Sequence, residues 1–130
     1  MKISLDGEKL QSLGVSAILI FGSTVEGTMH PNSDIDFAVL FKDKSHLKSS
    51  PVQVYGEIYE ELTKNFKGNI DIVYLHETPL SLQFNAVNDG ELIFCADEEF
   101  FYEYKDRVIM LYLDFKYFEG IFDRALIKND

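Results

Sequence analysis

Four short apolar runs, separated by stretches with helical periodicity, constrain the fold of this chain more than any other feature. The runs are residues 15–21, 34–41, 70–75 and 92–95. Each has the length of a strand, and the third is rich in β-branched side chains. Strands that alternate with helices build an α/β domain around one sheet. The sequence therefore predicts a small mixed sheet flanked by helices, and its 130 residues fit a single domain over residues 1–130.

The helices are predicted from residues that start and stop them. We expect a short helix at residues 6–13, one that Ser50 caps and Pro51 opens, one from Pro79 to Gly90, and a long one that Asp97 caps. The apolar face of the second helix would be Tyr55, Ile58, Tyr59, Leu62 and Phe66. The polar residues 42–50 are expected to form a loop.

The final helix carries more apolar residues than one buried face requires. One stripe, at alternating spacings of three and four, is Phe101, Tyr104, Val108, Leu111, Phe115, Phe118 and Phe122. A second set lies largely off that stripe, at Phe100, Ile109, Leu113, Tyr117 and Ile121. Either the helix is buried on two sides within the domain, or it presents an exposed apolar patch that would mark a protein interface.

Charge and composition limit the classes of protein to which the chain can belong. A formal net charge of −10 argues against a protein that grips nucleic acid backbones, because that task needs clustered Lys and Arg. The single cysteine, Cys95, excludes an intramolecular disulfide and is expected to be a buried core thiol. We find no segment typical of a secretory signal or of membrane-spanning length, so the cytoplasm is the expected compartment.

Two aspartates at the start of the second predicted strand are candidate metal ligands. Asp34 and Asp36 are two residues apart, so their side chains point to the same face of the strand. Carboxylates held side by side repel each other unless a cation lies between them, and Mg²⁺ prefers such oxygen ligands together with phosphate oxygens. The alternative is a pair of solvated aspartates at a strand end.

The first predicted strand ends in Gly22-Ser23, a turn that could bind phosphate. Its backbone N–H groups and the Ser23 hydroxyl are suitable donors, and a glycine lets a phosphate approach the backbone closely. A simple turn at the end of a strand would have the same sequence.

A third carboxylate, Asp71, interrupts the apolar run of residues 70–75. A charge there is costly unless it is paired or ligated, so Asp71 could complete a site for two metal ions with Asp34 and Asp36. It could instead lie on a wet face near the strand start, or pair with a lysine such as Lys67.

Taken together, these residues resemble the signature of the DNA-polymerase-β-like nucleotidyltransferase superfamily: Gly22-Ser23, then Asp34-Ile35-Asp36 after ten residues, then Asp71 on a later strand. The size is similar to that of the minimal nucleotidyltransferase (MNT) branch. Gly27 and Ser33 agree with it, as do residues 88–94 and 112–115, so the resemblance runs from about residue 15 to about residue 126.

The resemblance implies a nucleotidyltransferase fold and an antitoxin that is paired with a HEPN-domain ribonuclease toxin. It implies transfer of AMP from ATP to tyrosine hydroxyls of that toxin, with two Mg²⁺ ions held by Asp34, Asp36 and Asp71. Gly22, Ser23 and Ser33 would bind the nucleotide. Family members often carry a basic residue after Gly-Ser, whereas this chain has residues 24–26, Thr-Val-Glu. Neutralisation of a toxin by binding alone, and nucleotidyl transfer to a small molecule, are the alternatives.

Overall fold

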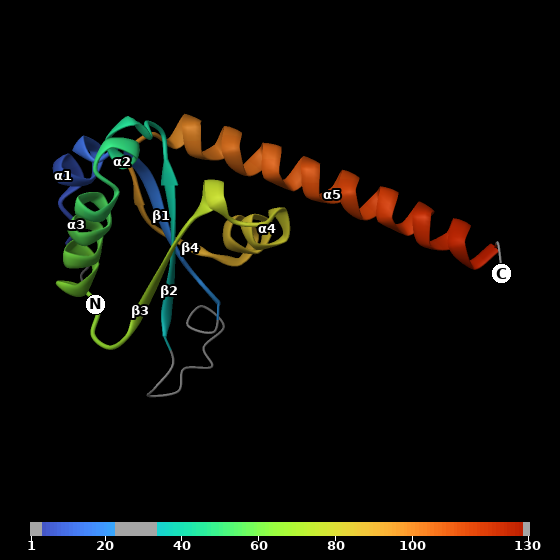
Figure 1. The fold of residues 1–130 in the computed structure, drawn as a ribbon, viewed down its shortest axis with the longest axis horizontal. Helices are drawn as coiled ribbons and strands as arrows, with labels where there is room; N and C mark the ends of the chain where they lie inside the picture. The colour runs from blue at the N-terminus through green and yellow to red at the C-terminus, as the bar shows by residue number, and fades with distance from the viewer. Residues whose placement is uncertain (1–3, 23–33, 129–130) are drawn as a thin grey trace.

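The computed structural model describes residues 4–22 and 34–128, with side chains through residue 126. Figure 1 shows a sheet between two groups of helices, with one long helix that projects away from the body. The elements in chain order are α1 (Gly7–Ser12), β1 (Val15–Phe21), β2 (Ile35–Phe41), α2 (Ser45–Ser49), α3 (Pro51–Thr63), β3 (Ile70–Tyr74), the 3₁₀-helix η2 (Leu75–Glu77), α4 (Leu80–Asp89), β4 (Glu91–Cys95) and α5 (Glu98–Lys128). The four predicted strands and the four predicted helices are confirmed.

The four strands form one mixed sheet in the order β3-β2-β1-β4. The central strand β1 is antiparallel to both β2 and β4, whereas β3 is parallel to β2 at the edge. A parallel pair cannot be joined by a tight hairpin, and α2 and α3 supply the crossover between β2 and β3. The α/β class and the small mixed sheet that the sequence predicts are therefore both confirmed.

The sheet separates two apolar cores, because successive side chains of a strand point to opposite faces. On β2, Phe37 and Val39 join the core that α1 and α3 cover. Ala38 and Leu40 join the other core, with α4 and the beginning of α5. Cys95 packs against this second core but is only half-buried, so the prediction of a fully buried thiol was wrong.

The predicted apolar face of helix α3 is confirmed at Ile58, Leu62 and Phe66 but not at the two tyrosines. Val54, Ile58 and Leu62 are buried, whereas Tyr55 and Tyr59 are 42% and 43% exposed. Glu61 also lies on the buried face, where its carboxylate accepts a hydrogen bond from the backbone N of Asp6 (2.9 Å) and has Lys9 and Lys64 nearby. The prediction erred because amphipathic tyrosines were counted as core residues and a paired glutamate was not.

The connection before α3 is more ordered than predicted. Residues 42–50 contain α2, whose Leu47 is buried against the first core. Pro51 occupies the first turn of α3, as expected, but the Ser50 side chain makes no capping hydrogen bond. The predicted cap is therefore not formed.

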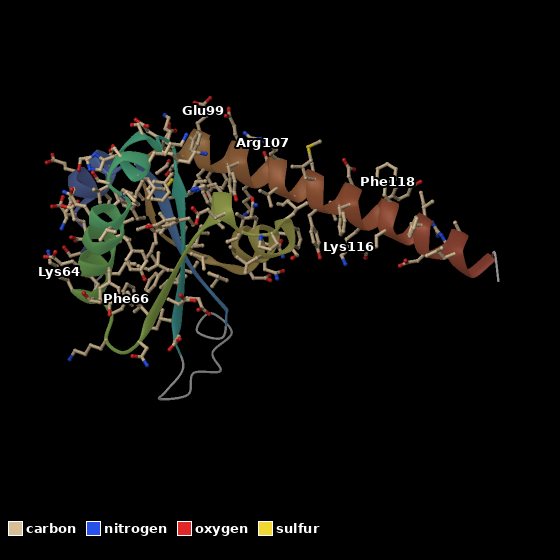
Figure 2. The ribbon with its side chains drawn as sticks, viewed as in Figure 1. Lys64, Phe66, Glu99, Arg107, Lys116 and Phe118 are labelled. Carbon is tan, nitrogen blue, oxygen red and sulfur yellow. The ribbon has the colours of Figure 1, made fainter. Side chains whose placement is uncertain are left out.

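Among the described residues, helix α5 packs against the body through its first half, from Phe101 to Tyr112. The Asp97 carboxylate accepts a hydrogen bond from the backbone N of Phe100 (3.1 Å), which confirms the predicted start of the helix. Phe101 and Val108 are buried, and the Tyr112 ring stacks on Phe84 of α4 at 4.1 Å between centroids. Beyond Tyr112 the helix extends away from the sheet (Figures 1 and 2).

The apolar stripe of α5 therefore continues past the part of the molecule that covers it. Phe115, Phe118 and Phe122 are 52%, 66% and 64% exposed. Of the two arrangements considered for this helix, the exposed apolar patch is the one that the structure contains. No helix in the described ranges combines the length and the apolar character needed to span a bilayer.

Candidate active site

The parallel pairing of β2 with β3 brings two of the predicted carboxylates together. Asp36 and Asp71 are register partners on the adjacent strands. Register partners point to the same face, and neighbouring strands lie about 4.8 Å apart. Asp34, two residues before Asp36, precedes β2, where the backbone N of Ile35 donates to the carbonyl of Asn69 (2.9 Å). The three aspartates thus gather at one end of the sheet, on the face that α4 and α5 share.

The electrostatics of this cluster are centred on Asp36. Burial raises the pKa of Asp36 above its ordinary value, and the negative charges of Asp71 and Asp34 raise it further. Asp34 and Asp71 are themselves exposed. The burial cost expected at Asp71 therefore falls on Asp36 instead. Lys67 and Asp71 form no ion pair, so that alternative is not what the structure shows.

Carboxylates that repel one another at a half-buried position are a donor set that suits a hard divalent cation. The chemistry of the three aspartates therefore fits Mg²⁺. Within residues 4–22 and 34–128, however, no group of three or more His, Cys, Asp or Glu side chains is close enough to hold an ion. The backbone places the three carboxylates as neighbours, and their side-chain rotamers do not form a closed ligand shell.

Gly22 lies directly against this cluster. Its neighbour Phe21 is the register partner of Asp36 across β1 and β2. The backbone of Gly22 has φ +86°, a conformation that side chains rarely adopt, and a Cβ there would lie 2.7 Å from Oδ2 of Asp36. Only glycine allows the chain to turn this close to the carboxylate, so the start of the predicted phosphate-binding turn lies directly beside Asp36.

Four of the six predicted site residues are thus brought to one end of the sheet: Gly22, Asp34, Asp36 and Asp71. Ser23 and Ser33 lie outside the described residues, as does the Thr-Val-Glu sequence that follows Ser23. The arrangement places a backbone turn beside acidic oxygens, which is a geometry suited to a phosphate ester that is bound through a cation.

The sequence of this chain matches a known protein family. The sequence pattern of the family described as Polymerase beta, Nucleotidyltransferase matches residues 8–99. A protein adenylyltransferase, MntA of Aphanizomenon flos-aquae (strain 2012/KM1/D3), is 26% identical over 107 residues, which cover 78% of this chain and 71% of that protein.

Solved structures agree on the fold. A chain of a toxin–antitoxin crystal structure with AMP-PNP matches with a TM-score of 0.65 and 23% identity, over 92% of this chain and 94% of that one. A chain of the complex between the tri-AMPylated Shewanella oneidensis HEPN toxin and an MNT antitoxin matches with a TM-score of 0.58 and 20% identity, over 92% and 95%. From the family match and the shared fold, this chain belongs to the polymerase β nucleotidyltransferase family.

Proposed function

We propose that this chain is a Mg²⁺-dependent nucleotidyltransferase that acts as an antitoxin, transferring AMP from ATP to tyrosine hydroxyls of a cognate HEPN ribonuclease toxin. The observation that carries the proposal is the pairing of Asp36 with Asp71, beside Asp34 and against the Gly22 turn. The relationship to an MntA adenylyltransferase and the likeness to complexes that contain AMP-PNP or an AMPylated toxin support it. Because the reaction consumes ATP, we propose the cytoplasm as its compartment.

In this proposal some residues of the site bind the phosphates of ATP and others bind the metal ions. The turn from Gly22 to Ser23, with Ser33, binds the outer phosphates of ATP and so points the α-phosphate at the carboxylates. Asp34, Asp36 and Asp71 would hold two Mg²⁺ ions through their carboxylate oxygens. Bound Mg²⁺ supplies positive charge for the attacking and leaving oxygens and favours deprotonation of the hydroxyl.

The balance of the reaction is simple. The tyrosine oxygen forms a bond to the α-phosphorus, the bond from that phosphorus to the bridging oxygen breaks, and pyrophosphate leaves. The proton of the hydroxyl passes to solvent or to a carboxylate of the site. The raised pKa of Asp36 is consistent with a cluster that needs positive charge for full ionisation.

The projecting part of α5 supplies a surface for the toxin. Phe115, Phe118, Ile121 and Phe122 line an almost wholly apolar depression of about 570 Å³ there. Exposed apolar surface of this kind is typical of protein interfaces. The same surface favours a second candidate function, neutralisation by contact alone, which the lack of a basic residue after Gly22-Ser23 also supports.

A mass measurement on the proposed partner separates the candidates. The chain is incubated with the proposed cognate HEPN protein, Mg²⁺ and ATP, and the mass of that protein is then measured by mass spectrometry. We expect an added AMP mass with the natural chain but not with Asp36→Asn. The control Asp106→Asn removes one negative charge from an exposed position of α5, and the partner should gain the AMP mass with it as well. Complex formation without any added mass would favour neutralisation by contact, and full transfer by Asp36→Asn would reject the assigned carboxylates.

A further inference from the structure

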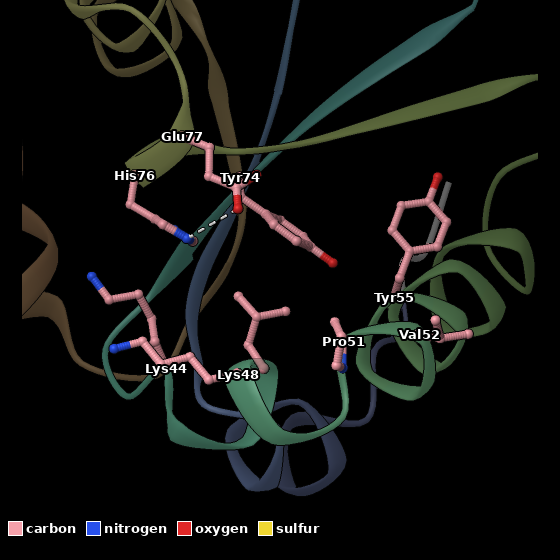
Figure 3. Close-up of a pocket in the computed structure, with 9 residues that line it drawn as sticks. Lys44, Lys48, Pro51, Val52, Tyr55, Tyr74, His76 and Glu77 are labelled. Carbon is pink, nitrogen blue, oxygen red and sulfur yellow. Dashed lines mark ion pairs between the residues drawn. The ribbon is translucent and has the colours of Figure 1, made fainter.

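A cavity of about 740 Å³ lies on the opposite face of the sheet from the aspartates. It is open to solvent and is lined by the end of β3, the residues after it, α2 and the beginning of α3 (Figure 3). Tyr74, which forms part of its wall, is three residues from Asp71, so the two side chains point to opposite faces. The volume falls in the range of about 300–1,000 Å³ that is typical of small-molecule sites.

One side of the cavity is positively charged. Lys44 and Lys48 line it, and neither forms an ion pair with any side chain that the structure describes. Glu77 is the acidic residue of the lining, and it lies 3.7 Å from Nε2 of His76. Burial lowers the pKa of His76 and the charge of Lys44 lowers it further, against an opposing effect of Glu77, so the neutral imidazole is favoured. Two lysines against one glutamate leave net positive charge, in a chain whose formal net charge is −10.

The remaining wall is aromatic and apolar. The Tyr74 and His76 rings stack nearly parallel, with centroids 5.9 Å apart and an angle of 9°. Phe41 packs edge-on against both rings and fixes their orientation. Opposite them lie Pro51 and Tyr55. A flat ring could enter between these walls, whereas an inorganic anion would leave them in contact with water.

Two polar features of the cavity lack hydrogen-bond partners among the residues that the structure describes. The hydroxyl of Tyr74 is buried and has no hydrogen-bond partner among the described residues. Figure 3 shows its oxygen directed toward the space between Pro51 and Tyr55. Burial raises the pKa of Tyr74 to about 12, so the hydroxyl keeps its proton and can donate. At the same place α3 begins without a side-chain cap, so the positive end of its dipole also faces this region.

We propose that this cavity binds a small phosphate ester that carries a planar ring, such as a nucleoside monophosphate. Lys44 and Lys48 hold the phosphate, since two ammonium groups can share the oxygens of a dianion. The ring lies between Tyr74 and Tyr55, and the Tyr74 hydroxyl donates to a polar atom on it. This site is independent of the aspartate cluster and of the reaction proposed there.

Titration calorimetry with AMP tests the proposal on the full chain. EDTA is present throughout, because it removes the divalent ions on which nucleotide binding at the aspartates would depend. We expect saturable binding that weakens at least tenfold in Lys44→Ala/Lys48→Ala. The charge-matched control Lys116→Ala/Arg124→Ala, far along α5, should bind AMP within twofold of the natural chain. Tyr74→Phe, which keeps the ring, should bind severalfold more weakly.

Two fragments of AMP show how much the phosphate and the ring each contribute to the affinity. Inorganic phosphate and adenosine should each bind at least tenfold more weakly than AMP. The proposal is overturned if AMP shows no saturable binding, if the double lysine variant binds it as well as the control does, or if inorganic phosphate binds as tightly. Loss of AMP binding in Asp36→Asn under the same conditions would also overturn it, because the ligand would then occupy the aspartate site.

Discussion

At Gly22 the backbone passes so close to a carboxylate that the identity of one residue decides the shape of the site. A Cβ added at Gly22 would lie 2.7 Å from Oδ2 of Asp36, and the φ of Gly22 is +86°. Gly68 has a similar φ of +101° with open space around it. The two glycines therefore separate backbone strain from the clash with the aspartate.

We expect Gly22→Ala to cost about 2–3 kcal/mol of unfolding free energy and Gly68→Ala about 1 kcal/mol, because both incur backbone strain and only the first also displaces a side chain. Urea denaturation of the two variants provides the comparison. Equal losses would show that the Asp36 side chain moves aside at no cost.

Asp36 should also make stability depend on pH in an unusual direction. Its pKa is raised in the folded protein above the ordinary value of 3.8, so the folded state binds the proton more tightly than the unfolded chain does. The ionised carboxylate therefore costs stability at pH 7, and this cost is relieved as the pH falls toward 3.8.

Asp36→Asn removes that charge, so we expect it to have a higher Tm than the natural chain at pH 7. The difference should shrink as the pH approaches 4, where the natural aspartate is becoming protonated. Asp106→Asn, at an exposed position, should show no such trend. Thermal melts of the three proteins at several pH values are the measurement, and a lower Tm for Asp36→Asn at pH 7 would contradict the burial of Asp36.

Much of the site was predictable at this scale, and the reason lies in strand periodicity. In extended backbone, the two-residue spacing of Asp34 and Asp36 gives their side chains a shared face. The sequence could not show that the cost of burial falls on Asp36 and not on Asp71. Burial depends on which strand lies at the edge of the sheet, and here that strand is β3. The sequence also gave no reason to group Lys44, Tyr74 and His76, which the crossover brings together.

At the scale of elements, start and stop residues were reliable and helix faces were less so. Pro51, Pro79 and Asp97 marked helix starts correctly because their effect is local. The exposed side of α3 was misjudged because Tyr55 is compatible with either environment, and because partners distant in the sequence accommodate Glu61.

Helix α5 should divide into a part that stabilises the fold and a part that does not. Phe101 is 3% exposed and Phe118 is 66% exposed on the same helix. We expect Phe101→Ala to cost about 3–5 kcal/mol, the usual loss for a buried phenylalanine, and Phe118→Ala less than about 0.5 kcal/mol. Denaturant unfolding of both variants tests this, and a large loss for Phe118→Ala would mean that the end of the helix is covered in solution.

For the whole molecule, the sequence supplied the strands but not their order. The proximity of Asp36 and Asp71 results from a parallel pairing between β2 and β3, which local patterns do not specify. The family resemblance supplied that information instead. The resemblance could not show how far α5 projects from the rest of the molecule. The length of a helix that is buried depends on which other elements pack against it.

Removal of residues 113–130 should leave the rest of the molecule folded. The last stacking contact with the body that the structure shows is that of Tyr112 on Phe84, which the truncated chain keeps. We expect its Tm to stay within about 3 °C of that of the full chain, since it loses little buried apolar area. Size-exclusion chromatography with the HEPN partner should show no complex.

Phe118→Asp in the full chain is the matched point variant, and it should weaken the same complex without changing the Tm. A truncated chain that melts much earlier, or one that binds the partner normally, would contradict this division of the molecule.

In the proposed complex, the part of α5 beyond Tyr112 would act as a spacer of defined length. Sixteen residues from 113 to 128 extend about 24 Å at the rise of an α-helix. A protein held at the tip is thus attached at a distance from the acidic oxygens, and the stiffness of the rod limits which of its side chains can swing back to them. Mutations on the end of α5 could then change the affinity for the partner without changing the rate of transfer at the aspartates. The length of the helix would determine which residue of the partner can reach the aspartates.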